Sequence, residues 1–194
     1  NKVELRKELS IPNESLIILF VGRVTLEKGV KELLAAFEYV LSLDIDAYLL
    51  FVGPFEPDGQ ACLDRISNLK VKDKMRIVGY SSEPEKYMAM SDVLCLPSYR
   101  EGFGTVVIEA AAMALPTVGS DIYGLSDAVV NGETGILVPA KNSQLLGIGL
   151  SQILCDIELR AEMATKARKR ALDYFDSAYI GGLVVDEYEK FSKY

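Results

Sequence analysis

The sequence predicts an α/β protein: a doubly wound, mostly parallel sheet with helices on both faces, followed by a helical C-terminal part. Two patterns support this fold class. Short apolar runs alternate along the chain with amphipathic stretches, and after Val138 the pattern becomes entirely helical. Uninterrupted apolar runs are typical of parallel strands that are buried on both faces. Because 194 residues, 49% of them hydrophobic, can bury one sizeable core, we expect a single domain over residues 1–194.

The six apolar runs are the predicted strands, namely Leu16–Val21, Ala47–Val52, Met75–Val78, Val93–Leu96, Thr117–Gly119 and Gly135–Val138. Between and after them lie the predicted helices, namely Val30–Leu43, Gln60–Leu69, Pro84–Met90, Thr105–Met113, Ser143–Asp156, Glu158–Tyr174 and a last one from about Ala178 to Tyr194. Regular alternation of strands and helices implies right-handed crossovers. Ligands of such a sheet bind at the carboxyl ends of its strands.

The composition excludes several kinds of site. A net charge of −7 without a long basic run argues against a nucleic-acid-binding surface, so an anionic ligand needs a local positive pocket. Three cysteines, Cys62, Cys95 and Cys155, lie far apart and suggest neither a zinc site nor a disulfide framework. The chain has no histidine, the commonest metal ligand and general base. We therefore expect a soluble, cytoplasmic protein with reduced thiols and no metal site.

The first strand runs into Gly22-Arg23, and Lys28-Gly29 follows just before the first helix. Two cations then stand where a doubly wound fold binds phosphate. The alternative is an ordinary turn with two solvated basic residues, but their place at a strand end favours the phosphate site. A dinucleotide-binding fold would need Gly-x-Gly-x-x-Gly at this turn, where the sequence has only Gly22.

A second constellation follows the strand Val93–Leu96. Glu101 and Glu109 are spaced Glu-x7-Glu, one in the loop and one about a turn inside the next helix, so that both can face the crevice at the helix N-terminus. Between them the run Gly102-Phe103-Gly104-Thr105 lets backbone N–H groups approach an anion, and the helix dipole favours negative charge there. A diphosphate would fit, and the carboxylates could accept hydrogen bonds from hydroxyl groups.

Plainer interpretations exist for these residues. Glu101 could simply support the helix cap and Glu109 could be a surface residue, although a carboxylate within so apolar a helix is costly to bury without a partner. Gly79-Tyr80, at the end of another strand, could contact a base, but a lone tyrosine is as often a packing residue. The basic run 166–170 is expected to be a solvated helix face.

These motifs together resemble the C-terminal domain of retaining glycosyltransferase family 4, glycosyl transferases group 1, with the GT-B fold. The resemblance rests on Gly-Arg-x4-Lys-Gly from Gly22, on Pro-Ser-x-x-Glu-Gly-Phe-Gly from Pro97 with Glu109-Ala110, and on the segment Asn131–Val138. It covers nearly the whole chain. It implies a Rossmann-like half of a GT-B enzyme that needs no cofactor and takes a UDP, GDP or ADP sugar as donor.

By position, the resemblance implies that Arg23 and Lys28 hold the donor diphosphate, together with the amides of Gly104 and Thr105. Glu109 would then bind the ribose. Glu101 would lie by the transferred sugar. Gly79-Tyr80 would contact the base. Ala114, Tyr123-Gly124 and Ser126-Asp127 depart from the family's usual residues and put the sugar-side loop and its specificity in doubt.

The resemblance also implies what surrounds this domain. An N-terminal domain would carry the glycan or lipid-linked acceptor, residues 178–194 would cross back onto that domain, and the polar start, residues 1–10, looks like a cut at the interdomain linker. We expect this chain to bind the donor without transferring its sugar. The resemblance allows peripheral membrane association of the full-length enzyme. Alternatives with the same fold are nucleotide-sugar epimerases, phosphorylases and a non-catalytic nucleotide-sugar sensor.

Overall fold

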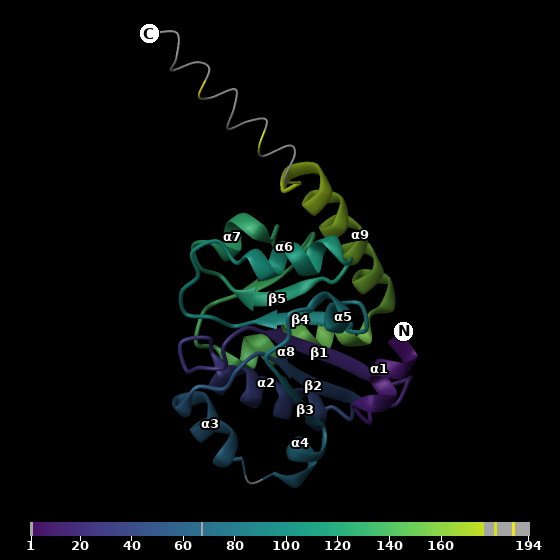
Figure 1. Cartoon of the computed structure of the whole chain (residues 1–194), viewed down its shortest axis with the longest axis vertical. Helices are drawn as coiled ribbons and strands as arrows, with labels where there is room; N and C mark the ends of the chain where they lie inside the picture. Colours follow the sequence, from purple (N-terminus) through teal and green to yellow (C-terminus); the bar gives the residue numbers. More distant parts are fainter. Residues whose placement is uncertain (1, 67, 177–180, 182–187, 189–194) are drawn as a thin grey trace.

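The computed structural model describes residues 2–66, 68–176, 181 and 188 (Figure 1). Its sheet has the strand order β3-β2-β1-β4-β5-β6. Each of these pairings is parallel, which confirms the doubly wound α/β fold. The strands are β1 (Leu16–Val21), β2 (Ala47–Val52), β3 (Met75–Gly79), β4 (Val93–Leu96), β5 (Thr117–Ser120) and β6 (Gly135–Val138). All six match predicted strands to within one residue.

The helices differ more from the predicted ones. They are α1 (Lys2–Glu8), α2 (Val30–Ser42), α3 (Pro57–Asp64), α4 (Leu69–Asp73), α5 (Glu85–Met88), α6 (Thr105–Ala112), α7 (Leu125–Ala128), α8 (Ser143–Cys155) and α9 (Ile157–Tyr174). The single predicted helix Gln60–Leu69 is wrong, because the chain forms two helices there. Proline near its N-terminus starts α3 early, and the side chain of Asn68 accepts a hydrogen bond from the Lys70 amide and caps α4.

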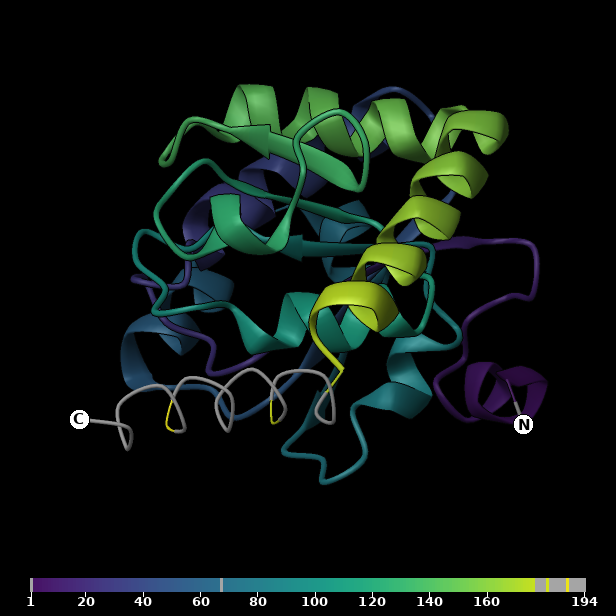
Figure 2. The ribbon, with the colours of Figure 1, turned by 90° about the horizontal axis from the view of Figure 1, so that it is seen from above.

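Helices cover both faces of the sheet. On one face α2 packs against α8, and α3 and α4 lie against α2. On the other face α6 contacts α9, and Figure 2 shows α9 running from the end of α8 towards α6. Along α9 the exposed side chains of Lys166 and Lys169 form ion pairs with Glu162 and Asp173, as a solvated helix face should. The prediction fails for Arg170, which is half-buried and donates to the Asp127 carbonyl at 2.9 Å. The last predicted helix, from about Ala178, lies outside the described residues apart from positions 181 and 188.

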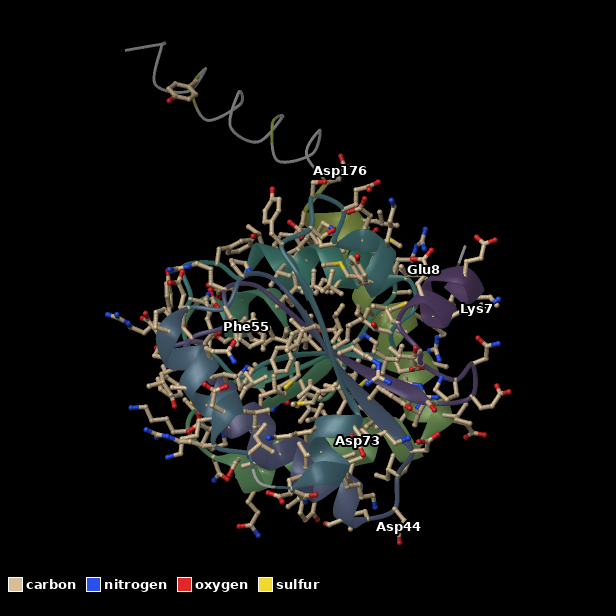
Figure 3. The ribbon with its side chains drawn as sticks, turned by 60° about the horizontal axis from the view of Figure 1, so that its bottom comes forward. Lys7, Glu8, Asp44, Phe55, Asp73 and Asp176 are labelled. Atoms are coloured by element: carbon tan, nitrogen blue, oxygen red, sulfur yellow. The ribbon has the colours of Figure 1, made fainter. Side chains whose placement is uncertain are left out.

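The hydrophobic core lies where β1 and β2 meet α2 and α8. Phe20 and Phe51 are fully buried with ring centroids 5.7 Å apart. Phe55, labelled in Figure 3, follows β2 and meets Phe51 edge-on at 5.5 Å. Such aromatic pairs are worth about 0.5–1.5 kcal/mol each beyond their buried area. They fix the turn after β2 beside the turn after β1, at the carboxyl edge of the sheet.

The start of the chain contains a helix, α1, that sequence reasoning did not predict. Lys7 and Glu8 point into solvent (Figure 3), whereas Arg6 is 3% exposed. The Arg6 guanidinium donates to the carbonyls of Ser15 at 2.7 Å and Met90 at 2.8 Å. It lies 3.6 Å from Asp92, which accepts a hydrogen bond from the Ile17 amide. Arg6 therefore fastens α1 to the starts of β1 and β4.

All three cysteines are free thiols in the structure. Burial raises the pKa of Cys95, whose thiol lies in β4, so this thiol stays protonated and unreactive. Among the described residues, no helix has the length and apolar character that crossing a membrane requires.

The sheet order creates one topological switch point, between β1 and β4. These strands are neighbours, yet the helix after β1 covers one face of the sheet and the helix after β4 covers the other. The loops at their carboxyl ends therefore diverge, and ligands of doubly wound proteins bind in the crevice between such loops. The residues that the sequence singles out follow these two strands.

Candidate functional site

A cleft of about 430 Å³ opens at the carboxyl ends of β1 and β4. We call it the β1–β4 cleft. Its walls come from the ends of the two strands, the loops that follow them and the first turns of α6. The residues that line it are Val21, Gly22, Arg23, Lys28, Leu96, Glu101, Phe103, Gly104, Thr105, Val106 and Glu109. Seven of these are predicted site residues, brought together from two loops and one helix.

The centre of the cleft is a charged contact between its two walls. The Lys28 ammonium lies 2.5 Å from Oε1 of Glu101, and the Ser98 hydroxyl donates to the same oxygen at 2.7 Å. The side chains of Lys28 and Glu101 are 24% and 12% exposed. A partly buried pair is weakly screened by salt, so the contact holds the two walls together. Ser98 was not singled out by sequence reasoning, although it stands in the same motif three positions before Glu101.

Arg23 contributes the second cation and is held much less firmly. Its side chain is 65% exposed, and the nearest carboxylate, that of Glu56, lies 3.9 Å away. An exposed pair at this distance contributes little stability. The Arg23 guanidinium is consequently available to an anion that enters the cleft.

The N-terminus of α6 faces the same cleft. Gly104 is its N-cap residue, with φ 62°, and makes no side-chain capping bond. The left-handed backbone conformation favours glycine here, and a side chain on Gly104 would have to displace the end of the Leu125 side chain, 2.8 Å away. Backbone N–H groups of the first turn of a helix lack intrahelical partners, and this turn includes the cleft residues Thr105 and Val106. This end of α6 suits an anion.

The remaining predicted residues lie around this centre. Glu109 is exposed and lines the cleft from α6. Gly102 is exposed, with open space where a side chain would lie. Gly79 and Tyr80 are not among the lining residues. The Gly79 carbonyl accepts a hydrogen bond from Gly53 at 2.7 Å, which places it beyond the turn after β2, and the Tyr80 side chain is 79% exposed.

Further contacts join the two loops that form the cleft. Arg100 donates two hydrogen bonds to Oε1 of Glu27, at 2.9 and 2.8 Å, and the Tyr99 amide donates to the Glu27 carbonyl at 2.9 Å. A β-carbon on Gly29, where φ is 74°, would lie only 2.1 Å from the Pro97 carbonyl oxygen. The loops therefore pack backbone to backbone, and this close approach requires glycine.

A larger hollow of about 830 Å³ lies on the face of the sheet covered by α2. We call it the α2–α3 groove; it is lined by α2, α3, α4 and the Tyr99 side chain, mostly by apolar residues. None of the predicted site residues lines it. We place the candidate site in the smaller cleft, because it gathers the two predicted cations, the two predicted carboxylates and the N-terminus of α6 at the carboxyl ends of β1 and β4, where doubly wound proteins bind their ligands. Within the described part of the chain, no three His, Cys, Asp or Glu side chains are grouped to hold a metal ion.

Comparison with known proteins identifies relatives along the whole chain. The family model "Glycosyl transferases group 1" matches residues 1–170. The capsular polysaccharide biosynthesis glycosyltransferase CapM of Staphylococcus aureus is 30% identical over 193 residues, which cover 100% of this chain and 50% of CapM. The N-acetyl-alpha-D-glucosaminyl L-malate synthase of Bacillus anthracis is 30% identical, covering 96% of this chain and 47% of that protein. The chain thus spans about half the length of these curated relatives.

Solved structures agree on the fold. A sucrose-phosphate synthase from Thermosynechococcus elongatus superposes with a TM-score of 0.83 and 30% sequence identity, over 98% of this chain and 49% of that one. A glycosyltransferase from Rickettsia africae gives a TM-score of 0.88 at 24% identity, over 99% and 52% of the two chains. Both likenesses support the Rossmann-like half of a GT-B fold that the resemblance implied.

Proposed function

Because the chain belongs to the glycosyl transferases group 1 family, we propose that it binds a nucleoside-diphosphate sugar in the β1–β4 cleft. It would form the donor half of a retaining transferase of hexose-type sugars. The observation that carries this proposal is the convergence of Lys28, Arg23 and the N-terminus of α6 on one cleft of an acidic chain. Fixed positive charge at this point suits a diphosphate.

The same groups suit the chemistry of transfer. When a sugar leaves a nucleoside diphosphate, negative charge builds on the departing phosphate. Arg23, Lys28 and the amides of Gly104 and Thr105 would stabilise that charge without reorganising, and such preorganised groups lower the barrier directly. Two side-chain cations can take the part that a divalent metal plays elsewhere. We therefore propose that neither donor binding nor transfer needs a metal ion.

The Lys28–Glu101 pair implies that donor binding proceeds in two steps, first at the diphosphate and then at the sugar. In the structure Glu101 holds Lys28 at 2.5 Å, so a diphosphate that approaches Lys28 competes with this carboxylate for the same ammonium group. Once the phosphate has taken its place, Glu101 can accept hydrogen bonds from the hydroxyl groups of the sugar. Glu109 would bind the ribose, and Gly79-Tyr80, which lie outside the cleft beyond the turn after β2, would contact the base.

Glu101→Gln separates these two roles of the carboxylate. The glutamine no longer competes for Lys28 by charge, so we expect the affinity for the nucleoside diphosphate to stay within about twofold or to rise. The affinity for the nucleotide sugar should fall about tenfold, because the sugar loses hydrogen bonds to a charged acceptor. Calorimetric titration of both ligands checks this. Equal losses of affinity for both would contradict the proposed exchange of partners.

The acceptor side of the proposal rests on the length of the relatives. The chain covers 50% of CapM and 47% of the B. anthracis synthase, which supports a further, N-terminal domain that binds a glycan or lipid-linked acceptor. CapM takes part in capsular polysaccharide biosynthesis, by its name, and this favours an acceptor of that kind. We propose that this chain alone binds the donor without transferring its sugar, and that the whole enzyme acts in the cytoplasm, at the inner face of the membrane when its acceptor is a lipid.

Isothermal titration with UDP, GDP and ADP, in buffer containing a chelator, tests the donor site. One nucleotide should bind, and Arg23→Ala and Glu109→Ala should each weaken it about tenfold or more, as expected when a hydrogen bond to a charged group is lost. Glu158→Ala, which removes an exposed carboxylate from the start of α9, is the matched control and should bind normally. If the three variants bind equally well, the nucleotide does not lie in the β1–β4 cleft.

A further inference from the structure

Glu32 is a buried carboxylate for which the proposed function has no use. It lies in the first turn of α2, is 8% exposed, and accepts a hydrogen bond from the Tyr99 hydroxyl at 2.6 Å. We infer that Tyr99, held by Glu32, is a positioning residue that sets the Glu101 carboxylate against Lys28. The inference rests on the proposed function, because it concerns the group that would meet the donor sugar.

The chemistry of the pair fixes the direction of the bond. Burial raises the pKa of the Tyr99 hydroxyl, and the neighbouring Glu32 carboxylate raises it further, so the phenol stays protonated and donates. The Lys141 ammonium lies 4.7 Å from the centre of the Tyr99 ring, on the side of the loop after β6. A buried acceptor that loses its donor is costly, which makes a single arrangement of the tyrosine strongly preferred.

The position of the pair in the chain connects it to the cleft. Helix α2 begins at Val30, directly after Lys28 and Gly29, whereas Tyr99 lies two residues before Glu101. The hydrogen bond to Glu32 therefore links the loop that carries Glu101 to the helix that follows Lys28. The Tyr99 amide adds a second link, 2.9 Å long, to the Glu27 carbonyl. The side chain and the backbone amide of Tyr99 thus each bond the loop after β4 to a residue beside Lys28.

The two hollows share this loop as their wall. Tyr99 lines the α2–α3 groove, whereas Glu101 lines the β1–β4 cleft. Loss of the hydroxyl leaves Tyr99 without its polar anchor and lets the loop shift towards the groove, which has room to receive it. A shift of about 1 Å is enough to impair a site that depends on aligned groups. A purely structural role would lower the stability of the fold and leave the folded protein's selectivity unchanged.

The test compares three single variants of the chain and one double variant. Tyr99→Phe removes only the hydroxyl. Glu32→Gln keeps an oxygen that can accept from Tyr99 and serves as the conservative rescue. Tyr48→Phe is the control, because the Tyr48 ring also lies beside a lysine ammonium, that of Lys74, but Tyr48 stands at the start of β2, at the opposite end of the strands. The double variant Tyr99→Phe, Glu32→Gln removes the bond without stranding a carboxylate, in case the single variant does not fold.

Two readouts decide the question. The first is the ratio of affinities for the nucleotide sugar and for the nucleoside diphosphate, measured with UDP-glucose and UDP, GDP-mannose and GDP, and ADP-glucose and ADP. We expect Tyr99→Phe to lower this ratio about tenfold, and Glu32→Gln and Tyr48→Phe to change it less than about twofold. The second is amide hydrogen exchange over residues 98–104, which needs no ligand and should become faster in Tyr99→Phe and in the double variant, but not in Glu32→Gln or Tyr48→Phe.

The outcomes separate this inference from the proposed function. If the unsubstituted chain binds none of these ligands, the donor-site proposal fails, and exchange alone decides whether Tyr99 positions the loop. An unchanged affinity ratio together with unchanged exchange in Tyr99→Phe overturns the inference while leaving the donor site standing. Equal effects in Tyr48→Phe also overturn it, because they would show a general loss of packing.

Discussion

Replacing Arg23 or Lys28 by alanine should lower kcat about a hundredfold to a thousandfold once the chain is joined to the acceptor domain proposed above. This is the usual cost of removing one preorganised group that stabilises charge in a transition state. Donor KM should rise less than kcat falls, because the phosphate carries more charge in the transition state than in the bound donor. Steady-state kinetics of sugar transfer with each variant measures both quantities.

The two substitutions should differ in their effect on the resting protein. Arg23 is 65% exposed and barely paired, so Arg23→Ala should leave the melting temperature unchanged. Lys28→Ala leaves Glu101, which is 12% exposed, without its cation, and should lower the melting temperature by a few degrees. Lys86→Ala removes an exposed lysine that pairs with the exposed Glu83 and is the matched control. Full activity in Arg23→Ala and Lys28→Ala would remove both cations from the mechanism.

Arg6→Ala should destabilise the chain by about 3–5 kcal/mol, the range seen when one partner of a buried ion pair is removed. The guanidinium serves four carbonyl groups, those of Pro12, Asn13, Ser15 and Met90, besides its contact with Asp92. Alanine leaves these groups without their donor. We expect α1 to detach from the starts of β1 and β4, and the midpoint of urea unfolding to fall.

The neighbouring position supplies the control for this prediction. Lys7 lies on the same helix and is exposed (Figure 3), so Lys7→Ala should change stability by no more than about 0.5 kcal/mol. Urea unfolding followed by circular dichroism compares the two variants under the same conditions. If Arg6→Ala proved as stable as Lys7→Ala, α1 would be dispensable to the domain and the buried guanidinium would have no structural role.

Most of the strands could be predicted from the sequence because they are short apolar runs that the structure buries; β3, at one edge of the sheet, is the exception and is only partly buried. β2, for example, is buried at every position. An uninterrupted apolar run such as Ala47–Val52 is typical of a parallel strand and is shorter than a typical buried helix. Helices α1 and α7 could not be predicted in the same way. The first depends on a buried arginine that bonds to carbonyls up to 84 residues away, and the second is a four-residue helix after Gly124, too short to show a helical period.

The same limit applies to the site. The runs Gly22–Gly29 and Pro97–Glu109 predicted where the cleft lies, because the ends of strands and the starts of helices can be recognised from the local sequence pattern. The pairing of Lys28 with Glu101 joins positions 73 residues apart, and that of Tyr99 with Glu32 joins positions 67 apart. Spacing along the chain carries no information on such contacts, because they depend on how two loops meet at the sheet edge. Tyr80, at a strand end, was placed by the resemblance near the base, and its role stays a prediction.

A crystal structure of the chain grown with its preferred nucleotide would test the central claim most directly. We expect the diphosphate in the β1–β4 cleft, within hydrogen-bonding distance of Arg23, Lys28 and the amides of Gly104 and Thr105, with Glu101 released from Lys28. The protein offers a clear alternative location, because the α2–α3 groove is the larger hollow, at about 830 Å³ against 430 Å³. A nucleotide found in that groove, with the Lys28–Glu101 contact intact, would show that the donor does not bind in the β1–β4 cleft.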